Sequence, residues 1–258
     1  MNAFSRSRER LAAMADSGRS VRVWWRDDDA RWPTRPLSRL LSLQAETGLP
    51  LALAVVPEGA EPSLAEALAG APDIAVLLHG WRHANHAPEG EKRAEYGDHR
   101  PASAMADEIA AGRDRLASLF GERFLPVFVP PWNRIGGDAK GLLSGLGLPV
   151  LSVYGPAAAG SPAKLNTHLD IMNWSAMRGL SLDALDARLA AELERRLLPA
   201  SDGEPEPLGL LTHHLQHDDR AWYGLEHLLA LLLDWPSAVR WPPIRELIAQ
   251  ATQSRPGA

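Results

Sequence analysis

Short apolar runs alternate along this chain with longer stretches in which apolar residues recur at helical spacing. The short runs are often β-branched, as parallel strands buried in a sheet are. They predict strands at residues 21–26, 51–56, 74–78, 124–129, 149–153, 165–172 and 208–212. The helical spacing predicts helices at 37–46 and 102–120, and a third that Ser181 caps and that runs to Leu198.

Regular exchange between strands and helices is typical of a parallel sheet or barrel. The chain has 258 residues, of which 45% are hydrophobic, and this fits a single barrel domain with a sizeable core. We predict an α/β fold, namely a distorted (β/α) barrel of about seven parallel strands formed by one domain over residues 1–258. The polar segment 201–207 is expected to be a surface connection, and 254–258 a short disordered C-terminal tail.

Potential metal ligands stand where three of these strands end. They are three aspartates after the first strand, two histidines after the third and two after the last: Asp27, Asp28, Asp29, His79, His83, His213 and His214. Each group alone is more typical of a solvated surface than of a site, but strand ends share the face on which barrel active sites lie. The chain has no cysteine, so His79, His83 and one of the aspartates are predicted to form the metal site.

The composition excludes several other classes of function. The formal charge of −5, without a long Lys/Arg cluster, predicts no nucleic-acid partner. The basic N-terminus has no apolar segment behind it and no run approaches ~18 apolar residues, so we expect a cytoplasmic protein without a membrane partner. There is no Gly-x-Ser-x-Gly elbow and no Gly-x-Gly-x-x-Gly after a strand. The sequence leaves the oligomeric state open.

Five motifs, taken in order, resemble those of the polysaccharide deacetylases of carbohydrate esterase family 4, the nodulation-deacetylase homology domain. The first two are the Asp-Asp pair, matched by Asp27 and Asp28, and the His-x-x-x-His pair, matched by His79 and His83. The resemblance implies a deacetylase-type barrel in which Asp27 is the catalytic base. It implies that Asp28, His79 and His83 hold the metal, with Asp29 as the alternative carboxylate.

The other three motifs complete the resemblance, which covers roughly residues 21 to 217. The third is matched by Val129-Pro130-Pro131-Trp132, the fourth by Asp170 and Trp174, and the fifth by Leu210-Leu211-Thr212-His213. The resemblance implies that His213 is the general acid and that Asp170 orients it. It also implies a divalent cofactor, foremost Zn²⁺, with Co²⁺, Ni²⁺, Mn²⁺ and Fe²⁺ as further possibilities.

Substrate contacts are expected beside these motifs. Trp81 and Trp132 can be sugar-binding rings or core residues, and Pro131 and Asn133 adjoin them. Trp174 is expected to fill the core instead. The expected substrate is a carbohydrate or another small molecule.

One departure from the family keeps alternative functions open. The arginine that opens the third motif and supports the base is replaced by Val129, and either Arg26 or Arg134 is a candidate substitute. The leading hypothesis is a metal-dependent hydrolase that removes an acetyl group from an N-acetylated sugar or related amide. The alternatives are hydrolysis of another non-peptide C–N bond in a small molecule, and a ligand-binding module that has lost turnover.

Overall fold

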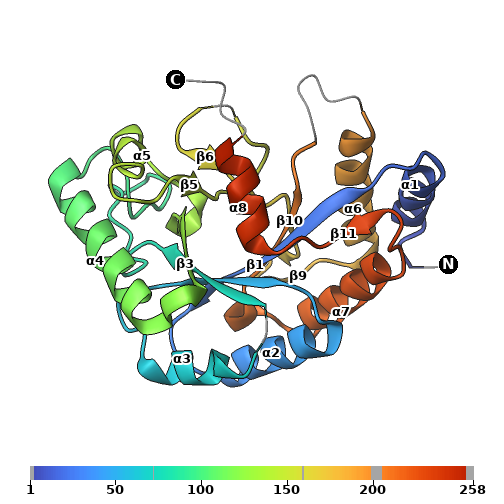
Figure 1. The fold of residues 1–258 in the computed structure, drawn as a ribbon, viewed down its shortest axis with the longest axis horizontal. Coiled ribbons are helices and arrows are strands. Elements are labelled where there is room, and N and C mark those ends of the chain that lie inside the picture. The colour runs from blue at the N-terminus through green and yellow to red at the C-terminus, as the bar shows by residue number, and fades with distance from the viewer. Residues whose placement is uncertain (1–2, 72, 159, 199–204, 254–258) are drawn as a thin grey trace.

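A curled parallel sheet forms the centre of the computed structural model (Figure 1), which describes residues 3–71, 73–158, 160–198 and 205–253. Its neighbouring strands follow the order β6-β5-β4-β3-β2-β1-β10-β7, every pair is parallel, and β11 pairs with β1. The strands are β1 (Val21–Ala30), β2 (Leu51–Val55), β3 (Ile74–His79), β4 (Phe124–Val129), β5 (Val150–Leu151), β6 (Ala163–Lys164), β7 (Leu169–Asp170), β10 (Leu208–Thr212) and β11 (Val239–Arg240). The predicted barrel of parallel strands is confirmed.

Helices surround this sheet, and the three predicted ones are confirmed. They are α1 (Ser5–Asp16), α2 (Arg35–Thr47), α3 (Pro62–Ala69), α4 (Ala102–Phe120), α5 (Gly137–Leu142), α6 (Leu182–Leu197), α7 (Asp219–Leu233) and α8 (Ile244–Gln253). The Thr34 hydroxyl accepts from the backbone N–H of Leu37 at the start of α2, and Ser181 caps α6 in the same way through Ala184. None of the helices in the described ranges is long and apolar enough to cross a bilayer.

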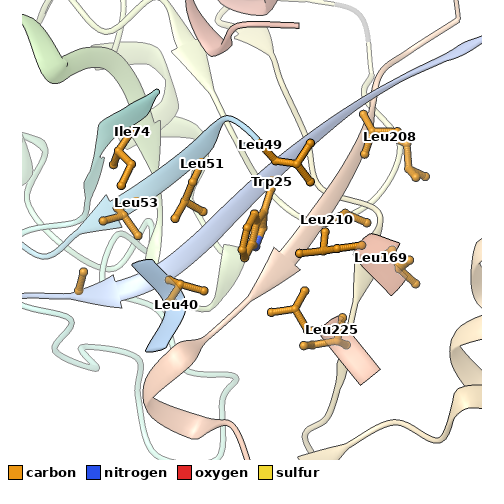
Figure 2. Close-up of a cluster of buried hydrophobic side chains, with 14 of the residues drawn as sticks. Trp25, Leu40, Leu49, Leu51, Leu53, Ile74, Leu169, Leu208, Leu210 and Leu225 are labelled. Carbon is orange, nitrogen blue, oxygen red and sulfur yellow. The ribbon is translucent and has the colours of Figure 1, made fainter. Parts of the chain in front are cut away.

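The two faces of the sheet bury two separate hydrophobic clusters. On β1, Val23 and Trp25 pack in the larger cluster, which includes residues of the surrounding helices (Figure 2). Trp24 points to the opposite face and packs with Ala52, Val127 and their neighbours in the barrel interior. Helix α8 contributes Ile244 and Leu247 to that interior cluster. Successive residues of β1 thus alternate between the helical layer and the interior, and this alternation continues into the aspartates.

The sequence prediction of one strand over 165–172 is wrong. The structure has β7 there, then β8 (Met172–Asn173), which pairs with β9 (Arg178–Gly179) in a separate antiparallel hairpin. The reason is a change of partner: the backbone N–H of Leu165 donates to Leu151 on one side of the barrel, whereas that of His168 donates to Gly209 on the other. This segment therefore links the two edges of the sheet instead of forming a single ladder. The predicted tail at 254–258 lies outside the described residues.

Candidate active site and metal centre

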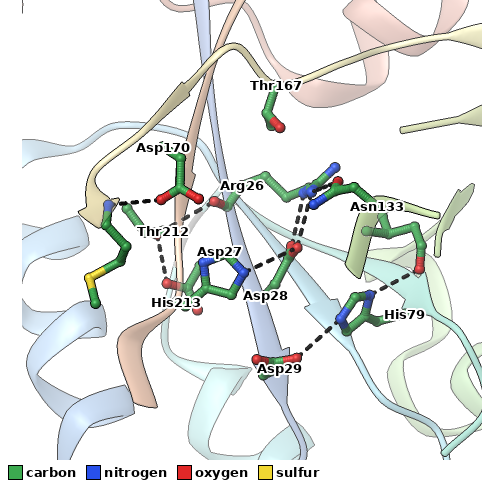
Figure 3. Close-up of polar contacts among 12 residues, drawn as sticks. Arg26, Asp27, Asp28, Asp29, His79, Asn133, Thr167, Asp170, Thr212 and His213 are labelled. Atoms are coloured by element: carbon green, nitrogen blue, oxygen red, sulfur yellow. Dashed lines mark hydrogen bonds and ion pairs between the residues drawn. The ribbon is translucent and has the colours of Figure 1, made fainter. Parts of the chain in front are cut away.

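Functional side chains gather at the carboxyl ends of β1, β3 and β10 (Figure 3). These strands lie near one another, since β10 pairs directly with β1 and only β2 lies between β1 and β3. In register, Asp27 faces Thr212, and His79 faces Val129. The sheet therefore brings side chains from residues 27–29, 79–83 and 212–214 to one edge.

Asp29, His79 and His83 form a cluster with the geometry of a metal site. One ligand atom from each lies within 4.8 Å of the others. A carboxylate oxygen of Asp29 is 3.1 Å from Nε2 of His79 and 3.4 Å from Nε2 of His83. Nδ1 of His79 lies 2.9 Å from the Val129 carbonyl and donates to it, so Nε2, which contacts Asp29, is the nitrogen that can bind a metal once it has lost its proton. One carboxylate and two imidazoles are a donor set that suits Zn²⁺ and similar ions.

The electrostatics of this cluster favour a bound cation. Burial alone would raise the pKa of Asp29, but its hydrogen bond with His79 and the neighbouring histidines hold that pKa well below its usual range. Burial likewise opposes charge on His79, yet Asp29 and Asp28 raise its pKa. Desolvation, followed by the charge on His79, lowers the pKa of His83 to about 4. His83 is thus neutral at physiological pH, as a ligand must be.

The sequence prediction grouped Asp28 with the two histidines, but the structure places Asp29 there. A register shift between Asp27 and Ala30 interrupts the pairing of β1 with β2, and Asp29 has a left-handed φ of 77°. This bulge turns the Asp29 side chain toward His79. Asp28 lies on the interior face of β1, the face that Arg26 also occupies two residues earlier.

Arg26 holds the carboxylate of Asp28 through two hydrogen bonds. Nε donates to Oδ1 at 2.8 Å and Nη2 donates to Oδ2 at 3.0 Å, and both side chains are almost completely buried. The remaining guanidinium bonds go to Ser152 at 2.6 Å and to the amide oxygen of Asn133 at 3.0 Å. Arg134 instead donates to the Arg93 carbonyl. Of the two candidates for the missing arginine, the structure therefore supports Arg26.

Asp27, the predicted base, points to the opposite face and is enclosed there. Its carboxylate accepts from the Thr212 hydroxyl at 2.6 Å and from the backbone N–H of His214 at 3.0 Å, and it pairs with Nδ1 of His214. The side chain is fully buried. Burial opposes ionisation of Asp27, but the charge on His214 outweighs it and lowers the Asp27 pKa, while Asp27 raises that of His214. This arrangement is a buried ion pair that is closed off from solvent.

His213 faces the same space as Asp28. Its Nε2 lies 3.8 Å from Oδ2 of Asp28, and its Nδ1 is buried with no hydrogen-bond partner among the described residues. Asp170 influences His213 by charge but bonds elsewhere, accepting from the backbone N–H of Met172 and from Nε1 of Trp174 at 2.7 Å. Burial raises the pKa of Asp170. We expected Trp174 in the core, but its side chain is 41% exposed. Its ring lies edge-on to that of His213, with 4.6 Å between the ring centroids.

The predicted substrate residues lie around this edge in different roles. The ring of Trp132 packs against that of His83, with 4.3 Å between the ring centroids. The backbone of Trp132 has a left-handed φ of 55°. Asn133 uses its amide oxygen to bind Arg26, and Pro131 is buried. Trp81 is half-buried in the turn between the two histidines. Trp132 is therefore the member of this group that packs against the Asp29–His79–His83 cluster, through the ring of His83.

Sequence reasoning missed some of the residues that shape this edge. Asn85 lies just after the two histidines in the sequence, but it accepts from the backbone N–H groups of Ala87 and Ala94. Glu95 instead reaches the turn that carries them, although it stands outside every motif. Ser152, which accepts from Arg26, lies near the carboxyl end of the predicted strand 149–153 and directly after β5, and this position was the available signal.

Comparison with known proteins was made by sequence and by structure. No family model matches the sequence, and no curated protein matches it. Solved structures do match: one from Mycobacterium smegmatis, which its name assigns to the polysaccharide deacetylases, is 16% identical with a TM-score of 0.64, covering 93% of this chain and 96% of that one. The chain has the polysaccharide deacetylase fold.

Two further structures of this fold show the range of its members. A family 4 acetyl xylan esterase from Clostridium thermocellum, in complex with a cobalt ion, is 14% identical with a TM-score of 0.55, and 89% of this chain and 91% of that one are covered. A mutant of a family 4 pseudoenzyme with restored activity is 12% identical with a TM-score of 0.56, covering 85% and 65%. The polysaccharide deacetylase fold thus occurs in enzymes and in a pseudoenzyme, so activity must be argued from the residues of the site.

Proposed function

We propose that this chain is a divergent family 4 deacetylase, a metal-dependent hydrolase that removes an acetyl group from an N-acetylated sugar or a related amide. The observation that carries the proposal is the position of the Asp29–His79–His83 cluster beside Asp28 and His213 at one edge of the barrel. A ligand set next to a carboxylate and an imidazole provides what hydrolysis of an amide needs, namely a base, an acid and an electrophile.

The cofactor in this proposal is one divalent ion, foremost Zn²⁺, held by Asp29, His79 and His83. The donor set fits it because His79 is fixed through Nδ1 and because Asp29 and His83 offer a charged oxygen and a neutral nitrogen. When bound, such an ion polarises the acyl oxygen and makes water more acidic.

Asp28 is the proposed general base in place of Asp27. The two Arg26 hydrogen bonds fix the orientation of its carboxylate, and its neighbour in sequence is the ligand Asp29. Asp28 would accept the proton of the attacking water as the water oxygen bonds to the acyl carbon. This assignment restores the family pairing of a base with an arginine, here within one strand.

His213 is the proposed general acid. It would donate its proton to the nitrogen of the breaking C–N bond, so that acetate and an amine leave. The edge of Trp174 packs against its ring and limits the rotation of that ring. Trp132 packs against His83 and Trp174 against His213, and both are suitable rings for a sugar face.

The proposal is tested by stripping the purified protein of metal, titrating Zn²⁺ and Co²⁺ back, and measuring acetate release from a panel of N-acetylated sugars and amides. We expect one ion per chain and metal-dependent release. His79→Ala should abolish both, while His227→Ala, which alters a half-buried histidine of α7 that bonds to the Tyr223 carbonyl, should change neither.

Two outcomes would contradict the proposal. Unchanged metal stoichiometry in His79→Ala would show that His79 is not a ligand and would contradict the proposed metal site. Metal binding without turnover of any panel member would favour the ligand-binding alternative, to which the pseudoenzyme of the same fold gives precedent.

A further inference from the structure

The turn between His79 and His83 has an unusual backbone. Gly80 and His83 both have a left-handed φ of 59°, and the two imidazoles that the turn carries lie 5.2 Å apart. A turn of this kind is not held by helical hydrogen bonds, so other groups must fix it. Two carbonyl groups of the turn are occupied: that of Trp81 accepts from the backbone N–H of Glu58, and that of Arg82 accepts from Arg31.

The N–H groups of the same turn converge on one carboxylate. Oε2 of Glu95 accepts from the backbone N–H of Trp81 at 3.2 Å, and Oε1 accepts from those of Arg82 at 2.9 Å and Ala84 at 3.4 Å. Glu95 is fully buried, and burial raises its pKa, although the three N–H groups act in the opposite direction. A buried carboxylate is costly, and here its stabilisation comes from this turn.

Gly80 gives independent support for the closeness of this contact. A Cβ atom at Gly80 would lie 2.1 Å from Oε2 of Glu95 and 2.7 Å from Pro131. The glycine therefore allows both the left-handed backbone and the approach of the carboxylate. Both oxygens of Glu95 accept from backbone N–H groups of the turn, so it holds the ligand residues through that backbone and, in addition, interacts with His79 by charge.

We propose that Glu95 is a positioning residue that fixes the turn between His79 and His83 and so sets the affinity of the site for its metal. This inference rests on the proposed metal site. Without the carboxylate, the three N–H groups lose their acceptor, the turn gains freedom and the two imidazoles must be ordered when the ion binds. Loss of a partner that orients metal ligands typically weakens metal affinity ~10–100-fold.

The test compares Glu95→Gln with a matched control. Glutamine has nearly the same shape, but it offers one acceptor oxygen and turns an NH₂ group toward an N–H donor. The control is Asp186→Asn, because Asp186 is also buried and also accepts from backbone N–H groups, those of Arg6 and Ser7, at the contact of α1 with α6. Both variants should lose stability, so thermal melting alone does not separate a structural role from a positioning role.

Metal affinity separates the two roles. By titration calorimetry with Zn²⁺, we expect affinity to fall ~10–100-fold in Glu95→Gln and to stay at the wild-type value in Asp186→Asn. The Co²⁺ absorption spectrum, which reports ligand geometry, should change only in the Glu95 variant. Glu95→Asp, which keeps the charge but is one methylene shorter, should give an intermediate affinity and serves as the test if Glu95→Gln does not fold.

The outcomes also distinguish this inference from the proposed function. If wild-type protein binds Zn²⁺, His79→Ala does not, and both Glu95 variants bind as tightly as the wild type, the positioning role is overturned while the metal site stands. If the wild-type protein itself binds no ion, the proposed function and this inference are overturned together.

Discussion

Two aspartates of β1, Asp27 and Asp29, are expected to respond in different ways to the same substitution by asparagine. They are two residues apart, and regular strand alternation would place both on one face. The left-handed φ of Asp29 breaks this pattern. Asp27→Asn should therefore reduce stability and leave metal binding intact. Asp29→Asn should weaken metal binding and reduce stability less.

The expected loss for Asp27→Asn is ~3 kcal/mol, the lower end for breaking a buried ion pair. The carboxylate pairs with His214 at a site that is completely buried, and its removal leaves the charged imidazole without a counter-ion. The asparagine oxygen can still accept from Thr212 or from the backbone, which keeps the loss near this limit. Because native stability is typically ~5–15 kcal/mol, the variant should remain folded.

Asp29→Asn should reduce the stability of the metal-free protein less than Asp27→Asn does. The side chain is 25% exposed, and asparagine accepts a left-handed backbone more readily than most residues. The Zn²⁺ affinity should fall by more than the ~10–100-fold that loss of an orienting partner costs, because the charged ligand itself is removed.

Urea unfolding of the metal-free proteins and calorimetric titration with Zn²⁺ measure the two effects separately. The reasoning is refuted if Asp27→Asn is as stable as the wild type, or if it loses metal while Asp29→Asn retains it. The second result would return Asp27 to the ligand set and would contradict the bulge that the structure places after Asp28.

Three further predictions concern the proposed base and acid, the backbone at Gly80, and the ion pair of Glu206 with His168. Asp28→Asn and His213→Ala should each lower kcat by ~10²–10⁴ on an acetylated substrate; unchanged kcat at full metal loading would exclude the proposed base and acid. Gly80→Ala should lower both the melting temperature and the Zn²⁺ affinity, because a Cβ atom has no space there; wild-type values would contradict the close contact. Burial opposes ionisation of Glu206, but His168 lowers its pKa below the ordinary 4.5. Its ~1–3 kcal/mol contribution is thus present above pH 4.5 and lost below, so Glu206→Gln should destabilise the protein at pH 7 and progressively less as the pH falls, measured by urea unfolding.

Much of the fold could be predicted because it depends on local patterns. Apolar runs such as those at 51–55 and 74–79 are buried whatever their neighbours are, and the helical spacing at 102–120 produces one buried stripe. The segment 165–172 could not be predicted in this way. Its apolar pattern resembles a strand, but its backbone partners come from both edges of the sheet, which the sequence does not identify.

The sequence by itself determined which residue types meet at the strand ends, because parallel strands place their carboxyl ends on one face. Only the tertiary structure decided what each aspartate does. A bulge directs the Asp29 side chain toward the histidines. On the interior face of β1, Asp28 binds Arg26, and on the face toward the helices Asp27 pairs with His214. Three identical side chains in a row carry no local signal for these differences, because the partners of Asp29 and Asp27 lie 50 and 187 positions away in the sequence. Asp28 pairs with Arg26 two residues earlier, but the backbone irregularity at Asp29 is what separates their roles.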